Sequence, residues 1–293
     1  MHVPVMLQEM LHAINPRPRG VYLDGTLGAG GYAEAILAAS DPDSMLVGLD
    51  LDPHAIARCT LRLDQYGERF KPAHGGFHDA KEILATLGIE EIDGAVMDLG
   101  LSSDQLEDPS RGFAFKESGP LDMRFDTTSG ETLEHLLGRI SQQDLTRVLE
   151  IYGEETHAKR VARSILAARD KRELATTKDL VRAITGIRAG KRGKIHPATR
   201  SFQALRIAVN KETEHLSQAL EQIPSLLRPG GRLCVVSYHS LEDRLVKVSF
   251  RERKADATHW VVLTPKPLRP TREEIAHNPR ARSAHMRVLA RAD

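Results

Sequence analysis

The sequence predicts an α/β fold, a Rossmann-like sheet of parallel strands interrupted by an inserted helical domain. Residues 20–98 alternate short apolar runs with helical patterns, which is the order of a parallel sheet. A glycine-rich turn joins the first apolar run to the first helical pattern. Past this region helical patterns follow one another, and a buried strand-like run returns at LCVVS, residues 233–237. The predicted divisions are 1–107 and 208–293 for the sheet domain and 108–207 for the helical domain.

The first strand and the turn after it form the most informative segment. The apolar run Val21–Leu23 ends in Asp24, and a turn follows that contains Gly28, Gly30 and Gly31. Glycines let the backbone turn sharply and approach a ligand that a Cβ atom would push away. Because a helical pattern begins directly after these glycines, the turn lies at a helix N-terminus. This is the layout of a nucleotide-type binding site.

The second apolar run supports the same interpretation. Met45–Leu49 ends in Asp50, which lies 20 residues beyond Gly30. At this position a carboxylate can accept hydrogen bonds from both hydroxyl groups of a ribose. The segment therefore predicts a strand, a glycine turn, a helix and a second strand that ends in an acid.

The acid before the glycine turn decides which nucleotide fits. Gly28, Gly30 and Ala33 match the G-x-G-x-x-A form of the dinucleotide fingerprint. However, Asp24 stands where the pyrophosphate of a dinucleotide would lie, and a carboxylate there repels phosphate. It suits a ligand with a positive sulfonium and an amino-acid tail, which is S-adenosylmethionine. The alternative is a glycine turn that only closes an ordinary strand–helix–strand unit.

A third strand end carries candidates for catalysis. The run Gly94–Met97 ends in Asp98, and Ser102, Ser103 and Gln105 follow it. A methyl acceptor at this edge of the sheet needs a polar group that holds its reacting atom in line with the methyl group. We expect Asp98 to be that group. For the serines, the alternative is capping of the helix that follows.

One amphipathic segment stands out in the helical region. His196–Asn210 is predicted to be a helix entered through a proline, with Arg200 and Arg206 near one polar face. That face is either a solvated surface or a contact surface for phosphates and bases. Beyond the helical region, Trp260–Leu263 and His285–Ala290 are predicted to pair as a closing hairpin.

The net charge of +1 conceals a division of charge between the two halves of the chain. Residues 1–150 hold 12 Lys/Arg and 25 Asp/Glu, whereas residues 151–293 hold 29 and 15. Residues 180–211 contain no acid at all. This polarity predicts a basic surface for a polyanion and favours nucleic acid over a merely solvated face. For Arg280 and Arg282 the alternative is that they only flank the last strand. The residues predicted to bind nucleic acid are Arg188, Lys191, Arg192, Lys194, Arg200, Arg206, Arg280 and Arg282.

Composition narrows the class of protein. A chain that is 41% hydrophobic and 28% charged is predicted to be globular. It contains no apolar run of membrane-spanning length and no signal-peptide pattern, so we expect a cytoplasmic protein without a membrane partner. Its two cysteines, Cys59 and Cys234, predict neither a disulfide framework nor a zinc site. His239, Glu242 and Asp243 match no standard metal template, so no metal is expected.

The segments above, taken together, resemble the RsmH (MraW) family of bacterial 16S ribosomal RNA cytosine-N4 methyltransferases. The resemblance covers nearly the whole chain. Several long, uncommon strings in the family's order are far more specific than a glycine motif. These strings are HVPVML, DGTLGAGG, VMDLGLSS, RGFAF, GPLDMR, YGEE, HPATRSFQALRIAVN, HSLEDRLVK and NPRARSA.

The resemblance implies a methyltransferase sheet with a helical insertion, S-adenosylmethionine as donor and a cytidine in the decoding region of 16S rRNA as acceptor. The implied partner is that RNA within the small ribosomal subunit, and a homodimer is left open. The chain departs from the family pattern at Tyr32, Leu51 and Phe125, where His, Arg and Met are common. The implied cofactor residues are Gly30, Gly31, Tyr32, Asp50, Phe77, Asp98 and Gln105.

For this reaction we expect direct attack of the exocyclic amine on the sulfonium methyl group. The amine lone pair is delocalised into the cytosine ring, so an acceptor on the N–H must localise it. Asp98 is the expected acceptor, with Ser102 or Asp122 as alternatives. No covalent nucleophile is needed, whereas methylation at C5 would require a cysteine.

Two other functions remain open from the sequence. A nicotinamide-dependent oxidoreductase would use a similar glycine turn, but Asp24 disfavours its pyrophosphate. A ribosome-assembly or RNA-binding protein would retain the fold without catalysis. The intact acids Asp24, Asp50 and Asp98 argue against this second alternative.

Overall fold

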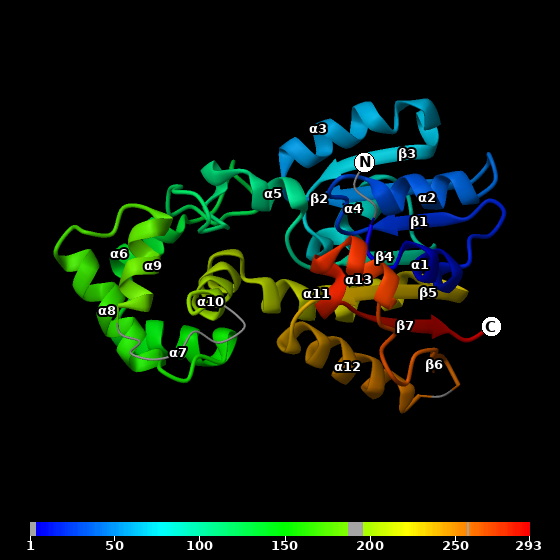
Figure 1. The fold of residues 1–293 in the computed structure, drawn as a ribbon. Coiled ribbons are helices and arrows are strands. Elements are labelled where there is room, and N and C mark those ends of the chain that lie inside the picture. Colours follow the sequence, from blue (N-terminus) through cyan, green and yellow to red (C-terminus); the bar gives the residue numbers. More distant parts are fainter. Residues whose placement is uncertain (1–3, 187–195, 257) are drawn as a thin grey trace. The chain divides into compact units, whose positions relative to one another are not determined.

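The computed structural model describes residues 4–186, 196–256 and 258–293. The chain divides into two compact units (Figure 1). The sheet unit comprises Met1–Gly100 and Thr213–Asp293, and the helical unit comprises Leu101–Glu212. Each unit has its own buried apolar core, so each is described by itself.

Seven strands form the sheet in the order β3-β2-β1-β4-β5-β7-β6 (Figure 1). The strands β1 to β5 run parallel, and β7 is antiparallel to both β5 and β6. This confirms the predicted parallel α/β sheet and the predicted pairing of the last two strands. The strands are β1 (Val21–Asp24), β2 (Met45–Asp50), β3 (Phe70–His74), β4 (Ile92–Asp98), β5 (Leu227–Ser237), β6 (Trp260–Val262) and β7 (His285–Arg291).

The register of the central strands places their acidic ends at one edge of the sheet. Central parallel strands are covered on both faces, so they read as near-continuous apolar runs that end where the chain leaves the core. Asp24 at the end of β1 is level with Gly48 of β2 and with Val96 of β4. Because strand order reverses direction between β1 and β4, this edge is the switch point where open α/β sheets bind ligands.

Helices cover both faces of the sheet (Figure 1). Side chains of α1, α2 and α3 pack into the core on one face, and those of α4, α11 and α12 pack on the other. The helices of this unit are α1 (Leu7–Ile14), α2 (Gly31–Ala39), α3 (Pro53–Arg62), α4 (Ala80–Thr86), α11 (Glu212–Leu226), α12 (Ser240–Lys254) and α13 (Arg272–His277). Short 3-10 turns occur at η1 (Asp64–Arg69), η2 (Phe77–Asp79) and η4 (Pro279–Ser283).

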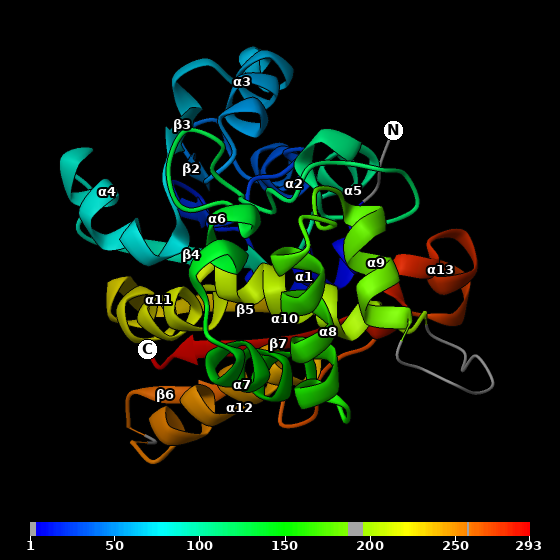
Figure 2. The ribbon, with the colours of Figure 1, turned by 90° about the vertical axis from the view of Figure 1, so that its left-hand side faces the viewer.

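The helical unit packs its helices around a separate leucine-rich core. The backbone of these helices is shown in Figure 2. Several of these helices begin at polar caps; Thr176, for example, forms a reciprocal capping box with Asp179 at the start of α9. The elements are α5 (Ser103–Glu107), η3 (Pro109–Arg111), α6 (Leu133–Arg139), α7 (Gln142–Gly153), α8 (Ala158–Asp170), α9 (Thr177–Thr185) and α10 (Thr199–Asn210).

The compact units divide a few residues away from the predicted divisions. The helical unit starts at Leu101 rather than at residue 108, because α5 belongs to it. It ends at Glu212 rather than at residue 207, because α10 continues to Asn210 and Glu212 pairs back with Arg206 at 2.8 Å. Within the part of the chain described above, no helix combines the length and the apolar character needed to cross a membrane.

Candidate active site

The glycine turn connects β1 to α2, and its glycines cannot be replaced without strain or steric conflict. Gly28 and Gly30 have φ angles of 52° and 77°, in the left-handed region that favours glycine. A Cβ atom at Gly30 would lie 3.0 Å from the Sγ of Cys59, and one at Gly31 would lie 2.3 Å from Pro4. Both positions therefore require glycine, and the chain presents bare backbone there.

Side chains from neighbouring elements hold this turn in place. The N–H of Gly28 donates to Asp50 Oδ2 at 2.7 Å. Arg62 on α3 donates to the carbonyl of Ala29 at 2.6 Å and forms an ion pair with Glu34 at the same distance. Because these contacts come from β2, α2 and α3, the turn is preorganised by the surrounding structure.

Asp24 is a fully buried acid at the end of β1. Its Oδ1 accepts the N–H of Thr26 at 3.1 Å, whereas Oδ2 is buried without a hydrogen-bond partner. Burial raises the pKa of Asp24 to about 7, and the charges of Asp98 and Asp50 act in the same direction. The backbone N–H groups of Thr26 and Ala33 oppose this shift. An unpaired buried carboxylate oxygen is costly, so Asp24 favours a cationic ligand.

Asp98 ends β4, the strand next to β1. Its backbone N–H donates to the hydroxyl of Thr26 at 2.6 Å, and its Oδ1 accepts from the hydroxyl of Tyr238 at 2.8 Å. Burial raises the pKa of Asp98 to about 7; the Tyr238 hydrogen bond lowers it and the charge of Glu242 raises it. A carboxyl group with this pKa exchanges a proton near neutral pH.

Three acids thus end three adjacent strands, as predicted. Burial also raises the pKa of Asp50, although the N–H groups of Asp52 and Gly28 oppose the shift. Asp24, Asp50 and Asp98 together give the edge negative charge when they ionise. The arrangement repels phosphate groups and suits a cationic ligand that carries hydroxyl groups.

The side chain of Tyr32 is buried in the core of the sheet unit, where the charges of Asp98 and Asp24 add to burial in raising its pKa. It is 4% exposed, and its hydroxyl donates to the carbonyl of Val5. Only the backbone of Tyr32, in the first turn of α2, is therefore available to a ligand at the glycine turn. The side chain of Phe77, on η2, lies beside the start of the turn. A Cβ atom added at Gly25 would lie 3.1 Å from the Cβ of Phe77.

The predicted site residues of the helical unit have clear local roles. Ser102 accepts the N–H of Gln105 at 3.2 Å, and the Gln105 side chain accepts the N–H of Ser102 at 3.1 Å. These bonds form a capping box, so the capping alternative for Ser102 is confirmed. Asp122 accepts two hydrogen bonds from Arg124, at 2.8 and 2.9 Å. Burial raises the pKa of Asp122, but Arg124 more than offsets this, so the pKa is lowered.

The predicted RNA-binding residues fall into three groups. Arg188, Lys191, Arg192 and Lys194 lie outside the described residues. Arg200, Arg280 and Arg282 are exposed, and Arg200 also donates to the carbonyl of Glu154 at 3.0 Å. Arg206 differs from both groups, because its side chain is 12% exposed and forms two hydrogen bonds to Glu212.

Sequence reasoning did not single out Tyr238 or Arg62. Tyr238 directly follows β5, so the rule that strand ends carry site residues would have found it. Arg62 lies on α3, 33 residues from the carbonyl that it binds, and nothing in the local sequence indicates that contact. His239 caps α12, and Asp243 pairs with Arg287 at 2.7 Å.

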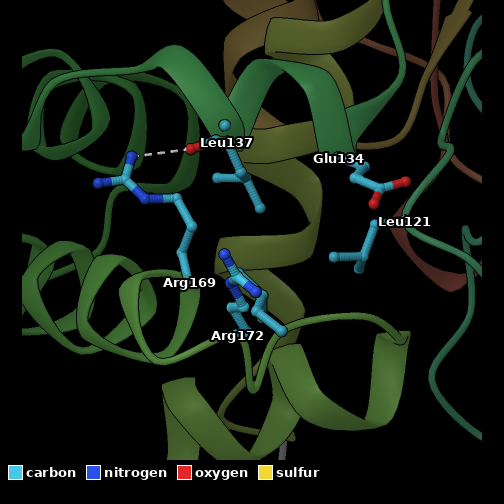
Figure 3. Close-up of a pocket in the computed structure, with 7 residues that line it drawn as sticks. Leu121, Glu134, Leu137, Arg169 and Arg172 are labelled. Carbon is cyan, nitrogen blue, oxygen red and sulfur yellow. Dashed lines mark hydrogen bonds between the residues drawn. The ribbon is translucent and has the colours of Figure 1, made fainter.

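A separate cavity of about 290 Å³ lies within the helical unit, beside α6 and the end of α8 (Figure 3). Figure 3 shows Leu137 and Arg172 directed toward it, and Arg169 bound to the carbonyl of Leu137 at 3.0 Å. Its lining residues are Leu121, Glu134, Leu137, Gly138, Arg169, Arg172 and Leu174. The predicted site residues are not among them.

Comparison with known proteins gives one family. A model of the MraW methylase family matches residues 1–292. The ribosomal RNA small subunit methyltransferase H of Thermomicrobium roseum is 45% identical, over 99% of this chain and 93% of the relative. Its counterpart in Citrifermentans bemidjiense is also 45% identical, over 98% and 97%. Among solved structures, an S-adenosylmethionine-dependent O-methyltransferase of Thermotoga maritima aligns with a TM-score of 0.46 and 9% identity, over 100% of this chain and 68% of the other.

Proposed function

Because the chain belongs to the MraW methylase family, we propose that it transfers a methyl group from S-adenosylmethionine to the exocyclic N4 of a cytidine in the decoding region of 16S ribosomal RNA. The names of the relatives, small-subunit ribosomal RNA methyltransferases, support this substrate class. The observation that carries the chemistry is the group of three strand-end acids beside a glycine-rich turn.

The residues of the sheet unit fit S-adenosylmethionine. The glycine turn and the unpaired Oδ2 of Asp24 would take the amino-acid tail and its ammonium group. Asp50 would take the ribose hydroxyls, since each of its oxygens accepts one backbone N–H and keeps a second lone pair. Phe77 and the backbone of Tyr32 complete the proposed set in this unit. Gln105, which the resemblance also implies, lies on α5 of the helical unit. When bound, the cofactor supplies a methyl group activated by a positive sulfonium.

Asp98 is the proposed acceptor for the amine N–H. Among the described residues Tyr238 alone donates to its side chain, and it binds Oδ1, which leaves Oδ2 for the substrate. The carboxylate localises the amine lone pair by accepting the N–H and takes up the proton that the product releases. Asp122 is a less suitable acceptor because its carboxylate forms an ion pair with Arg124. Ser102 is also less suitable because its hydroxyl group caps α5.

The cysteines support transfer to nitrogen rather than to C5 of the base. Cys59 and Cys234 are both buried, and burial raises the pKa of each thiol to about 12. A thiol with so high a pKa stays protonated at neutral pH and is a poor nucleophile. Neither cysteine is therefore available for the covalent catalysis that C5 methylation needs.

Replacing Asp24 with asparagine tests the predicted charge at the cofactor site. We expect the affinity for S-adenosylhomocysteine to fall about tenfold at pH 8, since one charge-assisted hydrogen bond is lost. Wild-type affinity should rise with pH through the pKa of Asp24, which is about 7. The asparagine variant should lose this part of the pH dependence, as measured by calorimetry across the pH range.

In the absence of ligand, the Asp24→Asn variant should have a higher free energy of unfolding than the wild type. Folding raises the pKa of Asp24 from 3.8 to about 7, so the folded chain loses stability as pH rises between these values. Asparagine cannot ionise, and its unfolding free energy at pH 8 should exceed that of the wild type by about 1–3 kcal/mol. The exposed Asp64→Asn change is the control. Equal unfolding free energies of the wild type and Asp24→Asn at pH 8 would contradict the raised pKa of Asp24 in the folded chain.

Charge reversal at Lys191, Arg192 and Lys194 together tests the proposed RNA surface. We expect weaker binding of 16S RNA fragments and a salt slope that falls by about 0.7–0.9 for each phosphate that the variant no longer neutralises. Filter binding at several salt concentrations measures both. Reversal of the cations Arg19, Lys71 and Lys81 of the acidic half is the matched control. An unchanged slope in the first variant would mean that this segment does not bind RNA.

Arg200, Arg280 and Arg282 remain proposed RNA contacts because they are exposed, whereas Arg206 is better explained as a structural partner of Glu212. We further propose a cytoplasmic enzyme that acts on RNA within the small subunit, in keeping with the names of its relatives. Methylation assays on free 16S RNA and on assembled subunits separate the two substrates. Light scattering measures whether the chain forms a homodimer.

A further inference from the structure

One hydroxyl group outside the predicted site holds the proposed catalytic acid. The hydroxyl of Tyr238, directly after β5, donates to Asp98 Oδ1 at 2.8 Å from 140 residues away in the chain. The two residues end adjacent strands, so the sheet itself brings them together. The bond occupies one carboxylate oxygen and leaves the other free to accept.

Tyr238 is itself held firmly. Its backbone N–H donates to Glu242 Oε2 at 2.9 Å, inside the cap of α12. Its ring packs against the apolar core beneath α1 and α2, and against Gly100, where an added Cβ atom would lie 3.4 Å from the ring. On the other side, Thr26 fixes the backbone of Asp98. Both ends of the hydrogen bond are therefore anchored to the sheet.

We propose that Tyr238 is a positioning residue for methyl transfer, which holds the carboxylate of Asp98 through Oδ1 so that Oδ2 is directed toward the target amine. The inference rests on the proposed function, because it takes Asp98 as the group that accepts the amine N–H. It assigns to Tyr238 no contact with the substrate.

The charges around Asp98 explain why such a donor matters. Glu242 on α12 and Asp24 at the end of β1 are acids, and each disfavours a negative charge on Asp98. Tyr32 on α2 is a neutral hydroxyl whose own pKa is raised by burial and by Asp98. The hydroxyl of Tyr238 is the group in this set that lowers the pKa of Asp98. It stays protonated, since burial raises its pKa well above the usual value.

Replacing Tyr238 with phenylalanine removes this one hydroxyl and keeps the ring. In the ligand-free chain, NMR titration of ¹³C-labelled aspartate carboxyl groups should show the pKa of Asp98 raised by about one unit or more, since a hydrogen bond to a charged group is lost. The Asp98→Asn variant identifies the resonance. The control is Tyr66→Phe, whose hydroxyl binds a backbone carbonyl on α2 instead.

Kinetics give an independent test. In Tyr238→Phe we expect kcat at pH 7 to fall about tenfold or more, with part of the loss recovered at pH 9, and the KM for the cofactor to stay close to wild type. An unchanged Asp98 titration together with a wild-type pH profile would overturn the inference. If the chain methylates no RNA at all, the proposed function fails, whereas the titration still reports on Tyr238.

Discussion

Replacing Asp98 with asparagine is expected to lower kcat for RNA methylation by about 10²–10⁴-fold, the usual contribution of a positioned acid or base. Asparagine keeps the shape of the side chain and can still accept the hydrogen bond of Tyr238. It cannot carry the negative charge that localises the amine lone pair. Transfer of radiolabelled methyl groups to 16S RNA under single-turnover conditions measures the effect on the chemical step.

Cofactor binding separates this explanation from a general loss of structure. S-adenosylhomocysteine should bind Asp98→Asn within a few-fold of the wild type, because the proposed cofactor contacts at Asp24 and Asp50 are intact. The exposed Asp64→Asn change should leave both binding and turnover unaltered. Full turnover in Asp98→Asn would remove Asp98 from the mechanism and direct attention to Asp122.

Replacing Asp50 with alanine is expected to weaken S-adenosylhomocysteine binding by about 100-fold or more, since up to two charge-assisted hydrogen bonds to the ribose are lost at about 1.5–3 kcal/mol each. The affinity for S-adenosylhomocysteine should also fall because the substitution changes the structure of the protein itself. Asp50 also accepts the N–H groups of Gly28 and Asp52, so the alanine variant leaves the glycine turn less ordered. Calorimetry of the purified chain measures the change.

Two further variants separate the loss of hydrogen bonds to the ribose from the loss of order in the glycine turn. Asp50→Asn keeps an acceptor for one backbone N–H and should bind more tightly than alanine but more weakly than the wild type. Asp64→Ala, at an exposed position, should bind like the wild type. Wild-type affinity in Asp50→Ala would exclude this carboxylate from the cofactor site.

The part of the fold that local sequence determines was predictable. Apolar runs that end in Asp24, Asp50 and Asp98 correctly indicated three parallel strands, and the rule for α/β sheets placed their ends at one edge. The position of the turn could be predicted from its glycines, because a positive φ angle or a close neighbour excludes a side chain there. These features depend on residues that are close together in the sequence.

Contacts between distant residues were not predictable from one sequence. Nothing near Tyr238 in the chain indicates that its hydroxyl reaches Asp98, because that contact depends on the order of the strands. Arg206 is basic in sequence but is paired and largely buried, since the chain turns after α10 and returns Glu212 to it. The burial of the Tyr32 side chain in the core was not predictable either, so the sequence could not decide whether that side chain contacts the cofactor.

Ionised acids at this edge of the sheet are unfavourable without a cation. Burial, with neighbouring acids acting in the same direction, raises the pKa of Asp24 and of Asp98 to about 7, and a bound cation would favour their ionised forms. A cationic cofactor therefore gains affinity from acids that reduce the stability of the unliganded fold above neutral pH. The raised stability of Asp24→Asn and its weaker binding are two consequences of the same cause.

Mass spectrometry of nucleosides from the decoding region of 16S RNA tests the central claim most directly. Cells without this protein should lack N4-methylation at one cytidine, the wild-type chain should restore it, and Asp98→Asn should not. A methylation pattern that is the same with and without the protein, or a restored methyl group on C5 instead of N4, would contradict the proposed function.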